Sequence, residues 1–354
     1  MKIQWIANNI NQIGGVERVI AQLSGFFVNC GNEVEIISLC TKKTNCFFTL
    51  DPAVKVRHLS VGMKENNSRL GIIKIIHQIA KESDADIVLG CNDYICNAMV
   101  INKPFFRGRI IVTQHNAIEF LSPKRLLLES LILRFADLFV VLSEHNKQYY
   151  EKKGVKNCIV VPNAISQEFL DIHDNREKII ITAGRLSRVK GFDFLIRAFK
   201  LVHDENPEWR LRILGDGEDR DRLSGLIKEL NLEDVVSLPG MTQSVITEFR
   251  KGSLFALTSH SEGFPMVLLE AMSQGLPIVS VDIPVISEIL DNGTYGVLTS
   301  RNEEEFALAI NAFLSDEQLL NEYGSLSLEC SKAYSMEKIG TYWLELFQSL
   351  KSNA

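Results

Sequence analysis

The stretch KIIITAGRLSRVKGFDFLIRAFK, Lys178 to Lys200, contains the unit from which the fold is built. An apolar run over 178–183 is followed by a loop between two glycines and then by a helical pattern that starts at 192. This order is typical of a buried parallel strand that an amphipathic helix connects to the next strand. It predicts a βα unit of a doubly wound α/β domain.

The same alternation runs through the whole chain. The first set of expected strands covers 3–7, 34–40, 86–90, 109–113, 138–142 and 158–161. The second set covers 178–183, 209–214, 235–238, 254–258, 276–281 and 296–298. Helical patterns lie between them, at 16–29, 70–82, 123–136, 192–204, 219–230 and 266–274. Two such sets predict two Rossmann-like parallel sheets.

The change from one set to the other places the domain boundary near 164–177, where a polar stretch precedes the next strand. We expect a first domain over 1–165, a second over 166–333 and a terminal segment over 334–354. That segment predicts an amphipathic helix, with Trp343, Leu346 and Phe347 on one side.

Composition and charge limit the class of protein. Of the 354 residues, 46% are hydrophobic and 23% are charged, so each domain can bury a core. The formal net charge of -6 argues against a nucleic-acid partner. The seven cysteines form no CxxC pair, which favours a reducing, cytoplasmic location. We expect neither a signal peptide nor a transmembrane segment.

Candidate functional residues follow the expected strands, because open parallel sheets bind ligands beyond their carboxyl ends. Gly14 and Gly15 could let a ligand meet backbone N–H groups at a helix N-terminus, although a tight turn alone would also use them. The GxGxxG pattern of dinucleotide-binding proteins is absent, which disfavours a dehydrogenase. His115 follows the strand at 109–113 and could bind a sugar hydroxyl, with a structural role as the alternative.

Charged residues mark the second half. Arg185 and Lys190 could turn two cations toward one anion, such as a departing diphosphate, with separate surface charges as the alternative. Glu262 and Glu270 stand eight positions apart around Pro265, which fits the first turn of a helix that Gly275 ends. Glu270 lies among apolar residues, where ribose hydroxyls could supply its partner. Carboxylates that only balance the helix dipole are the alternative.

Taken together, these stretches resemble the GT-B glycosyltransferases of family 4. The resemblance rests on Gly14–Gly15, on Gly184–Arg185 with Lys190–Gly191, and on the E-x7-E segment from Glu262 to Glu270. It implies two facing Rossmann-like domains with the chemistry in the cleft between them. The first domain would lie on the acceptor side, the second would bind the donor, and the terminal helix would cross back to the first.

The resemblance also implies a role for each matched residue. Arg185 and Lys190 would bind the diphosphate of a nucleotide-sugar donor, and Glu270 would hold its ribose. Glu262 would face the donor sugar, and His115 would touch it near the reacting carbon. The remaining donor contacts would come from Gly14, Gly15, Gly263, the backbone amides of Phe264, Met266 and Val267, and, around the base, Leu238, Gly240 and Met241. No metal and no separate cofactor are expected, since the cations take the metal's role.

Enzymes of this type retain the anomeric configuration, and the lack of an isolated nucleophile favours front-face displacement over a covalent intermediate. A UDP-hexose or UDP-N-acetylhexosamine donor is favoured over a GDP-sugar. The closest type is bacterial surface-polysaccharide assembly, of O-antigen or capsule, in which acceptors are lipid-linked. The loops at 8–13, 62–69, 91–97 and 115–123 would select the acceptor.

A lipid-linked acceptor implies peripheral contact with the inner face of the cell membrane. A helix over 123–135, with Lys124, Arg125 and Arg134 beside its leucines, could supply that contact. Burial of the leucines in the core of the first domain is the alternative. The sequence does not indicate an oligomeric state.

Other functions fit part of this pattern. A nucleotide-sugar epimerase would form its product from the donor alone, and a glycan phosphorylase would need a pyridoxal-binding lysine and a longer chain. A non-catalytic subunit that only binds a nucleotide sugar would have lost one of the key cations or carboxylates. This chain has them all: Arg185, Lys190, Glu262 and Glu270.

Overall fold

The computed structural model describes residues 1–12, 14–39, 46–59, 69–166, 176–242 and 244–352. Contacts within the chain divide it into two compact units. The first comprises Met1–Ser166 and Ser335–Ala354, and the second comprises Gln167–Tyr334. Most of the expected boundary and residues 13 and 62–68 of the expected acceptor loops lie outside the described residues.

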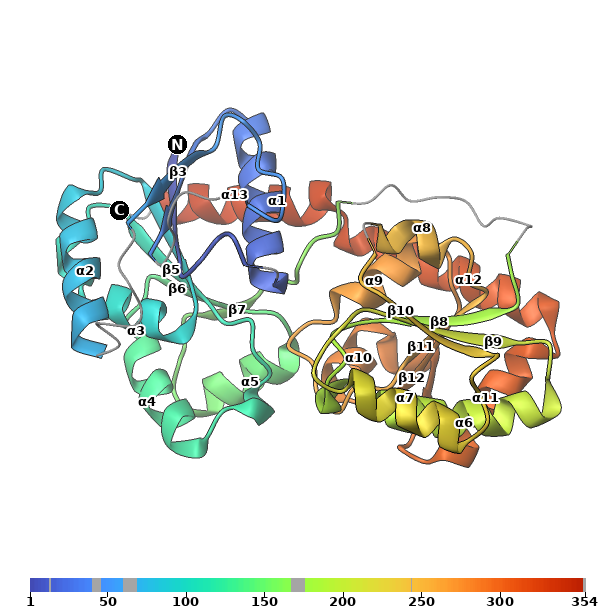
Figure 1. Cartoon of the computed structure of the whole chain (residues 1–354). Coiled ribbons are helices and arrows are strands. Elements are labelled where there is room, and N and C mark those ends of the chain that lie inside the picture. Colours follow the sequence, from blue (N-terminus) through green and yellow to red (C-terminus); the bar gives the residue numbers. More distant parts are fainter. Residues whose placement is uncertain (13, 40–45, 60–68, 167–175, 243, 353–354) are drawn as a thin grey trace. The chain divides into compact units, whose positions relative to one another are not determined.

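The first unit is a seven-stranded parallel sheet in the order β3-β2-β1-β4-β5-β6-β7 (Figure 1). Its strands are β1 (Lys2–Ala7), β2 (Glu33–Ser38), β3 (Lys55–His58), β4 (Ile87–Cys91), β5 (Arg109–Thr113), β6 (Leu138–Val141) and β7 (Cys158–Val160). Its helices are α1 (Gly15–Asn29), α2 (Arg69–Glu82), α3 (Asp93–Ile101), α4 (Pro123–Leu133), α5 (Glu144–Lys152) and α13 (Met336–Ser352), with 3-10 turns η1 (Lys103–Phe105) and η2 (Ile118–Phe120).

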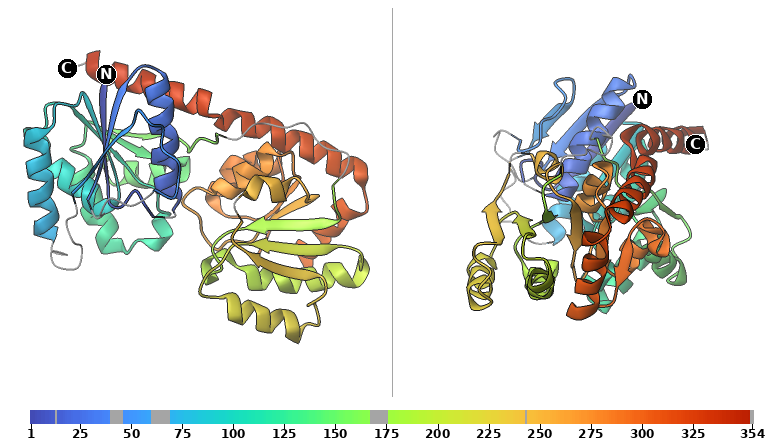
Figure 2. Two further views of the ribbon diagram at one scale, coloured as in Figure 1. Left: turned by 45° about the horizontal axis from the view of Figure 1, so that its top comes forward. Right: turned by 90° about the vertical axis from the view of Figure 1, so that its right-hand side faces the viewer.

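Helices cover both faces of this sheet, as the continuous apolar strands require. Ile110 of β5 belongs to the core beneath α2, α3, α4 and α5, whereas its neighbour Ile111 belongs to the core beneath α1 and α13. Figure 2 shows α13 beside α1, and the rings of Phe27 and Phe347 meet edge to face with centroids 5.2 Å apart. The C-terminal helix is therefore part of the first unit's core.

The second unit is a six-stranded parallel sheet in the order β10-β9-β8-β11-β12-β13. Its strands are β8 (Ile179–Ala183), β9 (Arg210–Leu214), β10 (Val236–Gly240), β11 (Leu254–Leu257), β12 (Ile278–Val281) and β13 (Val297–Thr299). Its helices are α6 (Phe192–Glu205), α7 (Arg220–Glu229), α8 (Val245–Phe249), α9 (Met266–Ser273), α10 (Pro284–Ile289), α11 (Glu303–Leu314) and α12 (Glu317–Ser331), with 3-10 turns η3 (Arg188–Lys190), η4 (Asp291–Gly293) and η5 (Lys332–Tyr334).

The core of the second unit also has two sides. α6, α7 and α11 bury one face of its sheet, and α9 packs with α8 and α12. Gly275 ends α9 as predicted, because it adopts φ +63° and its N–H donates to the carbonyl of Met272 at 2.9 Å. Within the described residues, no helix combines the length and the apolar character needed to cross a bilayer.

Two local predictions were wrong. β3 was not expected, because its side chains alternate in charge and none of them is fully buried at this edge of the sheet. Pro265 was expected within the first turn of a helix, but α9 begins at Met266. The ψ of 86° at Pro265 is not helical, so this residue precedes the helix and its carbonyl accepts the N–H of Leu268 at 3.0 Å.

Candidate active site

Each sheet has one point at which the strand order reverses direction. In the second unit this point lies at β8, between β9 and β11, and in the first unit it lies at β1, between β2 and β4. Loops that leave the carboxyl ends of such neighbouring strands diverge to opposite faces and leave a crevice for a ligand. In the second unit these loops carry Lys190 after β8 and Glu262 after β11.

The structure brings Lys190 and Glu262 together. The Nζ of Lys190 donates to the Oε1 of Glu262 at 2.6 Å, and the hydroxyl of Ser259 donates to the same oxygen at 2.6 Å. Both charged side chains are largely buried. Since one carboxylate oxygen takes both bonds, the other oxygen remains as an acceptor, and the ammonium group keeps further N–H donors for an anion.

Backbone contacts hold the two loops against each other. The N–H of His260 donates to the carbonyl of Val189 at 2.7 Å, and the hydroxyl of Thr258 donates to the carbonyl of Lys190 at 3.1 Å. Gly191 has φ +64°, and a Cβ there would overlap the carbonyl oxygen of Thr258. The glycine after Lys190 is therefore needed for this close approach.

Arg301 braces the same loop and was missed by sequence reasoning. Its guanidinium donates to the carbonyls of Thr258 and Ser259, at 2.9 and 2.7 Å, and lies 5.3 Å from the ring centre of Phe194. Arg301 follows β13, so its position after a strand was the available signal.

Arg185 does not join Lys190 in this structure. Its side chain is 74% exposed and forms a separate ion pair with Glu218 at 3.0 Å. Each of the two expected phosphate-binding cations thus has its own carboxylate partner. A surface ion pair of this kind is weak, so the side chain of Arg185 can leave it at little cost.

The remaining donor residues of the second unit lie at strand and helix ends. Gly263 and Phe264 lead from Glu262 to α9, Met266 and Val267 form its first turn, and the ring of Phe264 packs against Tyr334 at 6.0 Å. The first N–H groups of a helix have no intrahelical acceptor, so the amides of Met266 and Val267 suit an anion. Glu270 is only 1% exposed and has a partner within the chain.

Leu238, Gly240 and Met241, which were expected to border the nucleotide base, lie at the carboxyl end of β10. The carbonyl of Leu238 accepts a bond from Arg220 at 3.0 Å, and the carbonyl of Gly240 accepts the N–H of Gly215 at 2.8 Å. Met241, the next residue, is largely exposed. This segment is thereby tied to the loop that follows β9.

In the first unit, Gly14 and Gly15 stand at the start of α1, beside the switch point. Gly14 is extended, with φ -154°, and so adopts a backbone conformation open to any residue. A Cβ at Gly15 would meet nothing within 4 Å. The described chain therefore gives no packing reason for glycine at position 15, which fits the approach of a ligand.

His115 follows β5, and its hydrogen bonds define its tautomer. The hydroxyl of Thr113 donates to the carbonyl of Gly90 at 3.1 Å, so this hydroxyl has no second proton to donate to His115. The Nε2 of His115, 2.9 Å from that hydroxyl, must then be the donor. Burial lowers the pKa of His115 to about 4, so the ring is neutral at pH 7. It offers the lone pair of Nδ1 to a donor such as a sugar hydroxyl.

A buried polar network supports the loop that carries His115. The amide of Gln114 donates to the Oδ1 of Asp93 at 2.8 Å, and its oxygen accepts the N–H of Asn116 at 3.1 Å. Asp93 also pairs with Arg125. Asp93 and Gln114 were missed by sequence reasoning, although Gln114 adjoins His115.

α4 is the helix expected to contact the membrane, and its leucines are divided between two environments. Leu126 and Leu133 are buried in the core, whereas Leu127, Leu128 and Leu131 are 54%, 43% and 46% exposed. Arg125, expected on a basic surface, instead pairs with the buried carboxylates of Asp93 and Glu129. An unpaired buried carboxylate is costly, so Asp93 and Glu129 need a cation partner, and Arg125 supplies it instead of facing solvent.

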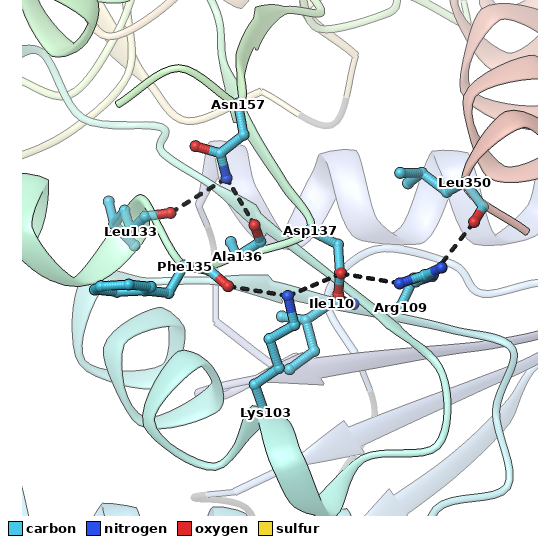
Figure 3. Close-up of polar contacts among 9 residues, drawn as sticks. All are labelled: Lys103, Arg109, Ile110, Leu133, Phe135, Ala136, Asp137, Asn157 and Leu350. Carbon is cyan, nitrogen blue, oxygen red and sulfur yellow. Dashed lines mark hydrogen bonds and ion pairs between the residues drawn. The ribbon is translucent and has the colours of Figure 1, made fainter. Parts of the chain in front are cut away.

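Charges at the opposite, amino edge of the first sheet are satisfied within the chain (Figure 3). Asp137, just before β6, accepts bonds from Lys103 at 2.8 Å and Arg109 at 3.3 Å, and from the N–H of Ile110 at 2.8 Å. Arg109 also donates to the carbonyl of Leu350 in α13 at 3.2 Å. This cluster joins β5, β6 and α13 and serves structure.

Comparison with known proteins identifies the family. The model for glycosyltransferase family 4 matches residues 13–169, and the model for glycosyl transferases group 1 matches residues 167–327. An uncharacterized glycosyltransferase of Methanocaldococcus jannaschii is 31% identical over 77% of this chain and 82% of its own. This chain belongs to the family 4 glycosyltransferases. The resemblance seen in its motifs is confirmed.

Two relatives of this glycosyltransferase have named roles. The amylovoran biosynthesis glycosyltransferase of Erwinia amylovora is 27% identical and covers 98% of this chain and 99% of its own. An N-acetyl-D-galactosaminyltransferase of Campylobacter jejuni, named for an acceptor on PP-undecaprenol, is 26% identical and covers 99% of both chains.

Solved structures show the same fold. A sucrose-phosphate synthase of Thermosynechococcus elongatus has a TM-score of 0.85 at 17% identity and covers 100% of both chains. The HepE protein of Anabaena, in complex with UDP, has a TM-score of 0.81 at 20% identity and covers 99% of this chain and 100% of its own. The predicted GT-B class, with two Rossmann-like sheets, is thus confirmed for this glycosyltransferase.

Proposed function

We propose that this glycosyltransferase moves a hexosyl or N-acetylhexosaminyl group from a UDP-sugar to a lipid-linked glycan, with retention of configuration and without a metal. The contact between Lys190 and Glu262 carries the proposal. It puts a cation and a carboxylate on the two loops that flank the switch point of the second sheet. A departing diphosphate needs positive charge, and a sugar hydroxyl needs an acceptor.

The donor would engage these groups in two places. The free N–H donors of Lys190, joined by Arg185 once it leaves Glu218, would hold the diphosphate, together with the first amides of α9. The second oxygen of Glu262 would accept a hydroxyl of the transferred sugar. UDP is proposed over GDP because the Anabaena protein of the same fold is a UDP complex.

His115 would accept another hydroxyl of the transferred sugar through Nδ1. The lowered pKa keeps the ring neutral, so it does not add a positive charge beside a sugar carbon that itself becomes positive as the bond breaks. Thr113 holds the ring through Nε2 and so fixes which nitrogen faces the substrate.

Transfer would take place on one face of the sugar. The bond between the anomeric carbon and the diphosphate oxygen breaks, the acceptor oxygen bonds to the same face, and its proton passes to the departing phosphate. Lys190 and Ser259 both bind Oε1 of Glu262, and the sugar hydroxyl would take its other oxygen, so neither oxygen is left to attack the anomeric carbon. Detection of a glycosyl group attached to Glu262 by mass spectrometry of a trapped reaction would contradict this route.

The acceptor is proposed from the relatives, one named for amylovoran biosynthesis and one for a PP-undecaprenol-linked glycan. Membrane contact would come from the exposed leucines of α4, with Lys124 and Arg134 near its ends. Leu127→Asp should reduce sedimentation with liposomes of anionic phospholipid, and Leu308→Asp, on α11 of the second unit, should not. Equal sedimentation of both variants and the wild type would exclude α4 as the membrane contact.

The first test is calorimetric titration of UDP and GDP, followed by assay of a panel of UDP-sugars. Tighter binding of UDP and its loss in Lys190→Ala are expected. Lys178→Ala is the matched control, because Lys178 adjoins the opposite end of the same strand and forms an exposed pair with Glu208. Failure of the wild type to bind either nucleotide would overturn the proposed function.

A further inference from the structure

A cavity of about 190 Å³ lies between α2, α3 and α4 of the first unit. Its wall is largely apolar and receives Ile73 from α2, Ile101 from α3 and Leu128 from α4. Leu127 and Leu131, which adjoin the lining residues Leu128 and Ile132 in the sequence of α4, and Phe105 on η1 are also exposed. A largely apolar cavity at the surface is a candidate binding site for an apolar group.

Two guanidinium groups lie at the same cavity. Those of Arg69 and Arg125 are 5.9 and 5.3 Å from the ring centre of Tyr94. Arg125 is held by the carboxylates of Asp93 and Glu129, and burial raises the pKa of Glu129. Arg69 has no carboxylate partner among the described residues. The guanidinium of Arg69 can therefore pair with an anion at the rim.

Asn97 adds a polar group without a partner. It lines the cavity, and its Oδ1 is buried without a hydrogen bond in the part of the chain that the structure describes. A carboxamide can turn to present either its oxygen or its NH2 group. The carboxamide of Asn97 thus keeps hydrogen-bonding capacity that a ligand in the cavity could use.

The cavity is connected to the loop of His115 by hydrogen bonds. Arg125 binds Asp93, Asp93 binds the amide of Gln114, and Gln114 holds the N–H of Asn116. A ligand that contacts Arg125 is thus linked to the residues on either side of His115. This connection favours a substrate over a lipid of the surrounding bilayer.

We propose that this cavity binds the phosphate and the first hydrocarbon units of the lipid that carries the acceptor glycan. Arg69 and Arg125 would hold the phosphate, with Asn97 beside them, and the apolar wall would take the chain. This inference rests on the proposed function for the identity of the acceptor, but binding can be measured without catalysis.

The test is titration of farnesyl phosphate, below its micelle concentration, into the full chain. Farnesyl phosphate should bind at least about tenfold more tightly than farnesol or inorganic phosphate, because only it fills both parts of the site. Arg69→Ala and Leu128→Asp should each weaken binding about tenfold, the effect of one charged contact or one buried charge. Arg69→Lys should retain part of the affinity.

Leu308→Asp is the control, since Leu308 is 66% exposed on α11 of the second unit. UDP titration of every variant separates the two proposals and shows that each variant is folded. Unchanged farnesyl phosphate binding in Arg69→Ala and Leu128→Asp, with normal UDP binding, would overturn the cavity assignment alone. Equal affinity for farnesol would remove the role of the arginines, and equal affinity for inorganic phosphate would remove that of the apolar wall.

Discussion

The carboxyl ends of the two sheets carry different chemistry on the same scaffold. In the second unit, the loops beside the switch point hold a largely buried ion pair of Lys190 and Glu262. In the first unit, the corresponding edge holds a neutral imidazole, His115, and a glycine pair with open space at Gly15. A cation and a carboxylate thus lie at the carboxyl edge of the second sheet, and a neutral hydrogen-bonding group lies at that of the first.

The amino edge of the first sheet provides the contrast to both. There, Asp137 accepts bonds from Lys103, Arg109 and a backbone N–H, so these charges pair with one another within the chain. Charges of similar type therefore have different roles at the two ends of a strand. The predictions below test this difference, from the largest expected effect to the smallest.

Lys190→Ala should have the largest effect. Loss of the cation should lower kcat/KM about 10²–10³-fold, the range for removal of a group that stabilises developing charge. Arg185→Ala should cost only about tenfold, because its side chain is 74% exposed and therefore binds an anion in a more solvated setting than Lys190 does. Steady-state kinetics with the preferred UDP-sugar measure both. Equal losses in the two variants would show that the buried pair has no special role.

His115→Gln should lower kcat up to about tenfold, the effect of losing one neutral hydrogen bond worth about 1–1.5 kcal/mol. The glutamine amide can replace the bond from Nε2 to Thr113 but does not offer an acceptor at the place of Nδ1. Affinity for UDP should stay within about twofold, since UDP lacks the sugar. His145→Gln, which removes an exposed pair with Glu119, is the control. A weaker affinity for UDP in His115→Gln would contradict a contact limited to the sugar.

Asp137→Asn should reduce stability and leave catalysis unchanged. We expect the free energy of unfolding to fall by about 1–2 kcal/mol, because Lys103 and Arg109 lose their shared carboxylate. Glu82→Gln, which breaks a more exposed pair with Arg57, should lower the free energy of unfolding less than Asp137→Asn does. Denaturant titration measures both, and a changed KM in Asp137→Asn would show that the amino edge also serves the substrate.

The smallest effect concerns pH. The pKa of His115 is 6.5 in its ordinary state and about 4 in the folded chain. Between these values the unfolded chain binds the proton and the folded chain does not, so the free energy of unfolding falls as pH drops from 6.5 to 4.

Because His115 keeps some exposed surface, we expect a contribution of about 1 kcal/mol between pH 7 and pH 5, below the roughly 2 kcal/mol that the pKa shift alone would give over this interval. Denaturant titrations at pH 7 and pH 5 should show a smaller fall in stability for His115→Gln than for the wild type. An identical fall would mean that the imidazole is not protected from protonation in the folded state.

Most strands and the candidate loops could be predicted because their signals are local. Gly275 ends α9 where the glycine predicts it, and Lys190 and Glu262 were recognised from glycine-flanked loops after strands. Sequence reasoning missed Arg301, Asp93, Gln114 and Ser259. The first three act through contacts with residues distant in the sequence, and Ser259 belongs to no recognisable motif. β3 was missed because an edge strand does not need a continuous apolar run.

By itself, the sequence determined the α/β class, the two sheets and the family, since apolar periodicity and glycine loops are properties of short segments. Only the tertiary structure decided that Lys190 pairs with Glu262 while Arg185 pairs with Glu218, and that Thr113 leaves Nδ1 of His115 as the acceptor. It also divided the leucines of α4 between core and surface. The physical reason is that burial and hydrogen-bond partners depend on which distant segments meet, and these set the charge state and the availability of each group.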